Sequence, residues 1–345
     1  MSYAKVRRFL GMVAAGAVML LPPSSGVLAQ PAGPLEFDSY LQLVGARARG
    51  EGVREETIMR VLSGLTPNYR VIELDRQQPG RQATPPAMAP YLARHVDSAR
   101  IAGGRRMFAQ SGDVLPGIRR DFGVAPQIIV AIWGHETNYG SYTGDFDLAR
   151  SLATLAWEGR RRALFEGELI ATMKMVDRGV PQHRLKGSWA GAFGNPQFLP
   201  SVYLTTAVDG NGDGDRDIWH SRPDTLASIA NYFNKAGWRP NEPWGVAASV
   251  PSGFDWSAVA SRLKAPSCDR VHERHSVWKT VAEWRDLGVI PRGTIAETTL
   301  ASLFQPDGPG TRAFLLTNNY RVILQYNCSN YYALSVGLLA DEIAR

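Results

Sequence analysis

The segment AIWGHETNYG, residues 131–140, places an ionisable carboxylic acid within an apolar helical pattern. Ile129, Ile132, Trp133 and Glu136 follow spacings of three, four and seven, so we expect them to share one helix face. The acid therefore lies among side chains that are typical of a protein core.

Glu136 is expected in the last turn of this helix. Proline suits the first helical position and glycine suits a left-handed stop, so the predicted helix begins at Pro126 and ends before Gly140. Desolvation and the negative end of the helix dipole both disfavour an ionised carboxylate there. An acid that keeps its proton near neutral pH can act as a general acid. A buried glutamate paired with an arginine is the alternative.

Metal and nucleophile chemistries have weaker support in the sequence. His135 precedes Glu136 as in a zinc-protease motif, but Tyr139 stands where the second histidine is required. The chain contains no G-x-S-x-G or Walker motif. His272 and His275 could bind a metal, although an exposed, charged turn is the expected interpretation.

A second candidate region is KGSWAGAFGNPQFLPSVY, residues 186–203. Its glycines allow the backbone to approach a ligand closely, and its prolines stiffen the turn. Ser188, Gln197 and Tyr203 add hydrogen-bonding groups and a ring. This composition fits a sugar-binding cleft and equally fits a tight structural loop.

The N-terminus has the order of a secretory signal. Basic residues precede an apolar run from Phe9 to Leu21, and small residues follow at positions 27–29. The apolar run is short for a membrane span. Removal of residues 1–29 takes the formal charge from +6 to +3, which suits an acidic polymer but is too weak to indicate nucleic-acid binding. We therefore expect an exported protein without stable membrane insertion.

The chain contains two cysteines, Cys268 and Cys328. In an oxidising compartment a disulfide between them is favoured, and two buried thiols are the alternative.

Helical patterns dominate the chain. They cover residues 35–66, 91–118, 126–140, 151–179 and 225–236. A Pro- and Gln-rich connection at 75–90, a region of mixed strand and turn composition at 246–314, and a C-terminal helix complete the pattern.

Several of these segments together resemble a known family. GHETNYG, KGSWAGAFGNPQFLPSVY, ANYFNKAGW and QYNCSNYY occur in the order and spacing of the lytic murein transglycosylase B family, over essentially the whole mature chain. The resemblance implies a mainly α (α+β) fold with a lysozyme-like helical core and a small β-containing insertion. It also implies cleavage of the β-1,4 bond between N-acetylmuramic acid and N-acetylglucosamine in peptidoglycan, leaving a 1,6-anhydromuramoyl end.

We expect the chain to be organised in five parts. They are a signal peptide (1–29), an N-terminal helical segment with linker (30–90), a lysozyme-like catalytic core (91–245), a small β-containing subdomain (246–312) and a C-terminal segment returning to the core (313–345).

The resemblance assigns Glu136 as the single catalytic acid, later base, with no catalytic cofactor. Guanidinium groups suit the lactyl and stem-peptide carboxylates of the substrate, and the spacing from Glu136 favours Arg161 and Arg162 among Arg160–Arg162. The expected substrate-binding residues are Tyr91, Arg161, Arg162, Ser188, Gln197, Tyr203, Tyr232, Tyr326, Asn327 and Tyr332.

A structural calcium site is predicted at DGNGDGDRDIWHSRPD, residues 209–224. The opening of this segment matches an EF-hand-type loop, but His220 replaces the acid at position twelve. An unmetallated turn is the alternative. The expected ligands are Asp209, Asn211, Asp213, Asp215 through its backbone carbonyl, and Asp224.

Two other functions are compatible with the sequence. A hydrolytic muramidase would need a second carboxylate, for which Asp145 and Asp147 are candidates. A non-catalytic peptidoglycan-binding protein would use the same surface without cleavage. In each case the expected partner is the peptidoglycan glycan strand.

Overall fold

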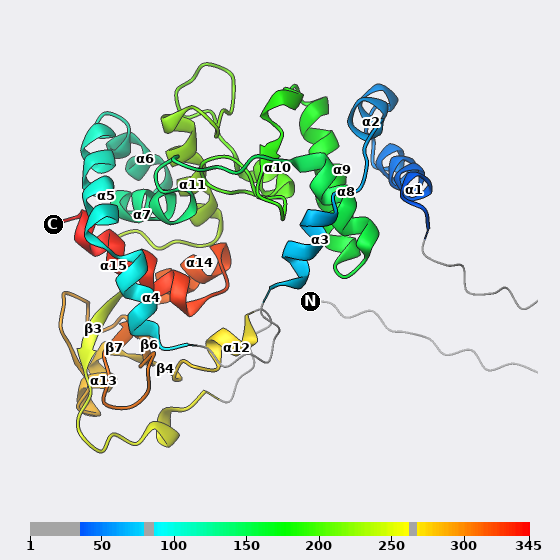
Figure 1. Cartoon of the computed structure of the whole chain (residues 1–345). Helices are drawn as coiled ribbons and strands as arrows, with labels where there is room; N and C mark the ends of the chain where they lie inside the picture. Colours follow the sequence, from blue (N-terminus) through cyan, green and yellow to red (C-terminus); the bar gives the residue numbers. More distant parts are fainter. Residues whose placement is uncertain (1–34, 79–85, 262–267) are drawn as a thin grey trace, which may run out of the picture. The chain divides into compact units, whose positions relative to one another are not determined.

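Helices make up most of the described part of the chain, as the sequence predicts (Figure 1). The computed structural model describes residues 35–78, 86–261 and 268–345, so the predicted signal peptide and part of the predicted linker lie outside the described residues. The helices are α1 (Phe37–Gly50), α2 (Glu55–Leu62), α3 (Tyr69–Arg76), α4 (Met88–His95), α5 (Ser98–Gln110), α6 (Leu115–Phe122), α7 (Pro126–Thr137), α8 (Leu148–Glu158), α9 (Arg162–Asp177), α10 (Pro200–Thr206), α11 (Arg222–Lys235), α12 (Asp269–His272), α13 (Val281–Asp286), α14 (Asn318–Tyr326) and α15 (Asn330–Ile343), with the short 3₁₀ turns η1 (Gln182–Arg184) and η2 (Trp256–Val259).

Two small antiparallel sheets accompany the helices. The larger has the strand order β4-β6-β7-β3-β5, and β1 pairs with β2 in the smaller. The strands are β1 (Phe146–Asp147), β2 (Lys186–Gly187), β3 (Gly245–Ser249), β4 (Trp278–Thr280), β5 (Ile290–Pro291), β6 (Leu300–Phe304) and β7 (Ala313–Leu316).

The larger sheet is buried on both faces at its centre. Successive residues of a strand point to opposite faces, so Phe314 and Leu316 of β7 join the core beneath α15, while Leu315 joins a separate cluster around Trp284. This arrangement explains why β7 is apolar at every position.

Two hydrophobic cores hold the helices. One contains buried residues of α6, α7, α11, α14 and α15, and the other contains those of α1, α2, α8 and α9. Tyr232 of α11 and Tyr326 of α14 pack against both. These two tyrosines therefore mark the boundary between the cores.

Helix α7 is buried around its whole circumference from Ile128 to Gly134, so the predicted single apolar stripe understates its burial. It begins at Pro126, as predicted. The predicted stop at Gly140 is two residues late, because Asn138 adopts the left-handed C-cap conformation with φ 49°. The amide side chain of asparagine makes that conformation accessible without glycine.

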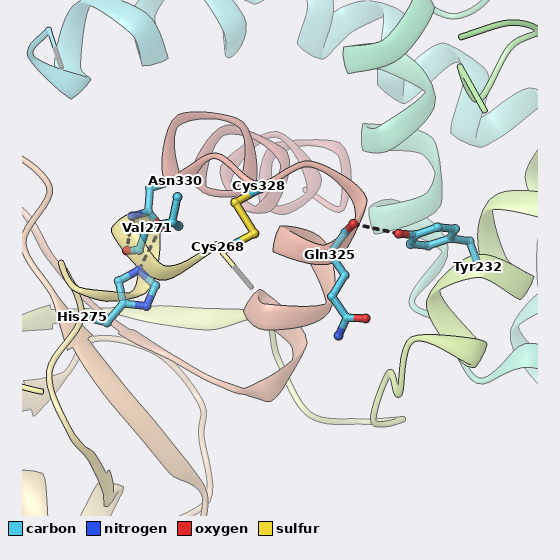
Figure 2. Close-up of a disulfide and its surroundings, with 7 residues drawn as sticks. All are labelled: Tyr232, Cys268, Val271, His275, Gln325, Cys328 and Asn330. Carbon is cyan, nitrogen blue, oxygen red and sulfur yellow. Dashed lines mark hydrogen bonds between the residues drawn. A yellow bond between two sulfur atoms is a disulfide. The ribbon is translucent and has the colours of Figure 1, made fainter. Parts of the chain in front are cut away.

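A disulfide joins Cys268, before α12, to Cys328 in the turn between α14 and α15 (Figure 2). Beside it, Asn330 donates from Nδ2 to the carbonyl oxygen of Val271 (3.0 Å) and its Oδ1 contacts His275 Nε2 at 2.8 Å. His275 is only 2% exposed, so the expectation of an exposed turn is wrong for this residue. The surrounding Phe304 and Tyr320 rings exclude water from it.

Candidate active site

Glu136 lies in the last turn of α7 and accepts a hydrogen bond from a distant helix. The hydroxyl of Tyr332, in the first turn of α15, donates to Glu136 Oε1 at 2.5 Å. Ser329 caps α15 by accepting from the backbone N–H of Tyr332, which sets the start of that helix. The packing of α15 against α7 then brings the two side chains together.

The half-buried position of Glu136 changes its acidity. Burial raises the pKa of Glu136 from 4.5 to about 7, while the hydrogen bond from Tyr332 lowers it. No second carboxyl group among the described residues contributes to this pKa. Desolvation alone therefore gives Glu136 the acidity of a group that can both donate and accept a proton near neutral pH.

Tyr332 acts only as a hydrogen-bond donor towards this carboxyl group. Burial and the charge of Glu136 raise the pKa of Tyr332 well above its ordinary value, so the hydroxyl keeps its proton. Because Tyr332 engages Oε1, we expect the exchangeable proton of Glu136 at Oε2.

Other tyrosines surround the pair. The Tyr326 ring lies parallel to that of Tyr332 at 6.5 Å and meets Tyr232 edge-on at 4.7 Å. The pKa of Tyr91 is raised by burial and also by the charge of Glu136, which places Tyr91 within electrostatic range of the carboxyl group. The structure thus brings four predicted residues, Tyr91, Tyr232, Tyr326 and Tyr332, into one group with Glu136.

Hydrogen bonds hold the outer tyrosines in place. Tyr326 donates to the carbonyl oxygen of Pro196 at 2.5 Å. Tyr232 donates to the carbonyl oxygen of Gln325 at 2.8 Å, as Figure 2 shows. The first bond ties α14 to the loop at 186–203. Both tyrosine hydroxyls therefore order main-chain segments around the site.

The loop at 186–203 is also fastened to α7. Trp133 Nε1 donates to Asn195 Oδ1 (2.8 Å), and the Thr137 hydroxyl donates to the carbonyl oxygen of Asn195 (3.1 Å). Asn195 Nδ2 in turn donates to the carbonyl oxygen of Trp219 at 2.9 Å. Asn195 and Thr137 are not among the predicted site residues, although they lie within the segments 186–203 and 131–140 respectively.

The glycines of this loop make room for protein atoms. A Cβ atom on Gly187 would lie 2.3 Å from the carbonyl oxygen of Ala192, and one on Gly191 would lie 2.5 Å from a Leu152 methyl group. The alternative of a tight structural loop therefore accounts for these two glycines.

The predicted polar residues of the loop have internal partners. Gln197, with φ 50°, donates from Nε2 to the carbonyl oxygens of Thr143 (3.1 Å) and Gly194 (2.9 Å). Ser188 Oγ accepts from the backbone N–H of Ala192 at 3.0 Å. Both side chains therefore help to fix the shape of the loop.

Tyr203 lies in the hydrophobic core. Its ring packs beside Phe193 and Trp219, and its hydroxyl donates to the carbonyl oxygen of Arg216 at 3.2 Å. Burial raises the pKa of Tyr203 to about 12. The structure does not bring this predicted residue into the group around Glu136.

The arginine cluster is engaged with its own surroundings. Arg160 and Arg161 both bond to Asp75, whose pKa they hold below its ordinary value against the larger, opposing effect of burial. Arg162 donates to the carbonyl oxygens at the end of α8. The Nε atom of Arg161 is buried and has no hydrogen-bond partner among the described residues. Asn327 is exposed at the end of α14, directly before Cys328.

The acidic loop at 209–224 is ordered by its own backbone. Asp209 accepts from the N–H groups of Gly212, Asp213 and Gly214, and Asp224 accepts from those of Gly210 and Asp217. Within the described residues, no three acidic, histidine or cysteine side chains gather around one point.

The side chains of this loop fit a cation only in part. Burial, and then the charge of Asp209, raises the pKa of Asp224, so these two carboxylates repel each other. The Asp215 side chain, however, forms an ion pair with Arg184 at 2.6 Å. Asp215 is thus left with its backbone carbonyl as a possible ligand.

Comparisons with known proteins identify relatives of this chain. The family model for the transglycosylase SLT domain matches residues 36–341. The chain is 30% identical over 339 residues to membrane-bound lytic murein transglycosylase B of Escherichia coli (strain K12), covering 94% of this chain and 88% of that relative.

Solved structures show the same similarity. SltB3 from Pseudomonas aeruginosa in complex with NAG-anhNAM-pentapeptide matches with a TM-score of 0.80 and 38% identity, covering 89% of this chain and 79% of that one. The Escherichia coli lytic transglycosylase Slt35 in complex with calcium matches with a TM-score of 0.70 and 27% identity, over 88% of this chain and 92% of that one.

Proposed function

The chain belongs to the transglycosylase SLT domain family and is a peptidoglycan lytic transglycosylase, and we propose that Glu136 is its single catalytic acid and base. The observation that supports this assignment is the half-buried carboxyl group with a pKa of about 7, to which no second carboxyl group of the described residues contributes. A paired-carboxylate glycosidase would place a second acid across the scissile bond.

Glu136 transfers a proton in each of two steps, first as an acid and then as a base. Glu136 protonates the bridging oxygen from Oε2 as the bond from C1 of N-acetylmuramic acid to that oxygen breaks. The carboxylate then removes the proton of the C6 hydroxyl, whose oxygen bonds to C1 of the same sugar. The products are a chain with a free 4-hydroxyl and a 1,6-anhydromuramoyl end, and no water is consumed. Attack within one sugar has a high effective concentration, which favours it over hydrolysis.

The hydrolytic alternative has less structural support. Asp147 caps α8 by accepting from the backbone N–H of Arg150 at 2.7 Å, and Asp145 is exposed. Neither carboxyl group contributes to the pKa of Glu136. Among the residues that the structure describes, no carboxylate that could activate water is coupled to the acid.

The substrate surface extends from Glu136 through the tyrosine group. Aromatic faces of Tyr91, Tyr232 and Tyr326 pack against sugar rings, and Tyr332 orients the acid. Ser188 and Gln197 of the loop lie along the bound glycan strand. Asn327, at the exposed end of α14, also contacts it. Arg161 and Arg162 supply guanidinium donors for substrate carboxylates, in exchange for part of their present contacts with Asp75 and with the end of α8.

Mass spectrometry of muropeptides released from purified sacculi tests the reaction. We expect anhydro ends, which differ from hydrolytic reducing ends by the mass of one water. Glu136→Gln should abolish release while glycan binding persists, and Asp145→Asn should release anhydro products at the wild-type rate. Reducing ends from the wild-type enzyme, or full activity of Glu136→Gln, would contradict the proposal.

Calcium is proposed to stabilise the loop at 209–224. The ligands are Asp209, Asn211, Asp213, the backbone carbonyl of Asp215, and Asp224, and a cation would relieve the repulsion between Asp209 and Asp224. Calcium should raise the melting temperature relative to EDTA, and Asp209→Asn should remove the increase. Equal melting temperatures at millimolar calcium and in EDTA would exclude the site.

The site of action is proposed to be the periplasm, with residues 1–29 as the export signal. No helix in the described ranges is both long and apolar enough to cross the bilayer. Cell fractionation, with N-terminal sequencing of the mature protein, tests this assignment. Intact residues 1–29 on a cytoplasmic protein would refute it.

A further inference from the structure

A separate cavity opens beside the catalytic helix. It has a volume of about 440 Å³ and lies between α5, from its N-cap Asp97 to Met107, and the residues that follow α7. Helices α5 and α7 pack side by side (Figure 1). Its polar lining residues are Asp97, Arg100, Arg106, Asn138, Tyr139 and Ser141.

The lining is electropositive. Neither Arg100 nor Arg106 forms an ion pair with a carboxylate of the described residues, and Arg100 Nε is buried without a hydrogen-bond partner among them. The one acid in the lining, Asp97, uses its Oδ1 to cap α5 by accepting from the N–H groups of Ala99 and Arg100. Two arginines and one carboxylate thus line the cavity, so the lining carries a net positive charge.

Arg100 connects this cavity to the catalytic group. Its Nη1 lies 3.4 Å from His135 Nδ1, and its carbonyl oxygen accepts from the Tyr139 hydroxyl at 2.8 Å. His135 directly precedes Glu136 in α7. Burial is the main cause of the raised pKa of Tyr91. The charges of Arg100 and Glu136 also act on this pKa, in opposite directions, so both groups lie within electrostatic range of Tyr91. An anion held by Arg100 and Arg106 would therefore lie beside the bound glycan strand.

We propose that this cavity, which we call the Arg100–Arg106 pocket, binds a carboxylate of the stem peptide carried by the strand being cleaved. The inference rests on the proposed function, because it requires a murein strand at Glu136. Guanidinium groups bind carboxylates through directed, paired hydrogen bonds. The amide of Asn138 and the hydroxyl of Ser141 add polar groups for the peptide backbone.

The test compares two soluble, uncross-linked glycan substrates, one with intact stem peptides and one from which an amidase has removed them. For each variant, the measured quantity is the ratio of kcat/KM on the first substrate to that on the second. Arg106→Gln should lower this ratio by about fivefold, as expected for a partly exposed charge-assisted contact. Arg106→Lys should restore part of it.

Arg105→Gln is the matched control. Arg105 is adjacent to Arg106 on α5, is also exposed, and donates from Nε to the carbonyl oxygen of Glu342 at 2.9 Å, outside the cavity lining. This variant removes the same charge and should keep the wild-type ratio. An unchanged ratio in Arg106→Gln, or an equal decrease in Arg105→Gln, would overturn the proposal that the Arg100–Arg106 pocket binds a stem-peptide carboxylate. Failure of the proposed function would instead abolish anhydro products from both substrates in the wild-type enzyme.

Discussion

Tyr332 donates a hydrogen bond to Glu136 across 196 positions of sequence, and this bond joins α15 to the proposed catalytic acid. Burial raises the pKa of Glu136, and this bond limits the increase. The acidity of the proposed catalyst therefore depends on two helices that the chain brings together only on folding.

Replacement of Tyr332 by phenylalanine should raise the pKa of Glu136 further. Loss of one hydrogen bond worth about 1 kcal/mol should lower kcat by about fivefold, because the acid is no longer oriented. The pH at which activity declines on the alkaline side should also move upwards. A pH–rate profile of Tyr332→Phe beside wild type measures both effects, and a profile with an unchanged alkaline limb would show that the bond does not set the acidity.

The wild-type enzyme should lose kcat/KM as the pH rises through about 7, since general-acid catalysis needs protonated Glu136 and burial raises its pKa to about 7. The same shift affects stability. A carboxyl group whose folded pKa exceeds its unfolded value stabilises the fold below the unfolded pKa, and this contribution is lost as the pH rises through the folded value.

Glu136→Gln should accordingly be more stable than wild type at pH 8, by on the order of 2 kcal/mol, and the difference should shrink towards pH 4. Urea unfolding at both pH values provides the measurement. A difference in unfolding free energy that does not vary with pH would rule out the raised pKa.

Asn195→Ala should release the loop at 186–203 from α7. It removes the acceptor of Trp133 Nε1 and the donor to Trp219, and leaves a buried indole N–H without a partner. We expect a loss of about 2 kcal/mol in unfolding free energy and a lower kcat/KM. Gln110→Ala, on the exposed end of α5, is the control and should change neither quantity. Wild-type stability and activity in Asn195→Ala would argue against this attachment.

Reduction of the Cys268–Cys328 disulfide should destabilise the protein. The bond closes a loop of 60 residues, for which the chain-entropy estimate is about 4 kcal/mol. Cys268→Ser/Cys328→Ser should therefore unfold at lower denaturant concentration, and a reducing agent should shift the wild type but leave the double variant unchanged. Coincident unfolding curves for oxidised and reduced wild type would contradict this expectation.

The local elements and Glu136 as the candidate acid can be predicted from the sequence alone. Pro126, the apolar spacing from Ile129 to Trp133 and the motif around Glu136 predict α7 because helix signals depend on neighbouring residues. The order of the motifs also predicts the family and the mainly helical fold, both of which are confirmed.

Which side chains meet depends on the tertiary structure. Tyr332 reaches Glu136 through the packing of α15 on α7. Arg161 bonds to Asp75, which lies 86 positions away in the sequence. Tyr203 is likewise buried in the core by the packing of neighbouring elements. Such contacts depend on the burial of whole helix faces, whereas sequence spacing constrains only residues within a few turns of each other.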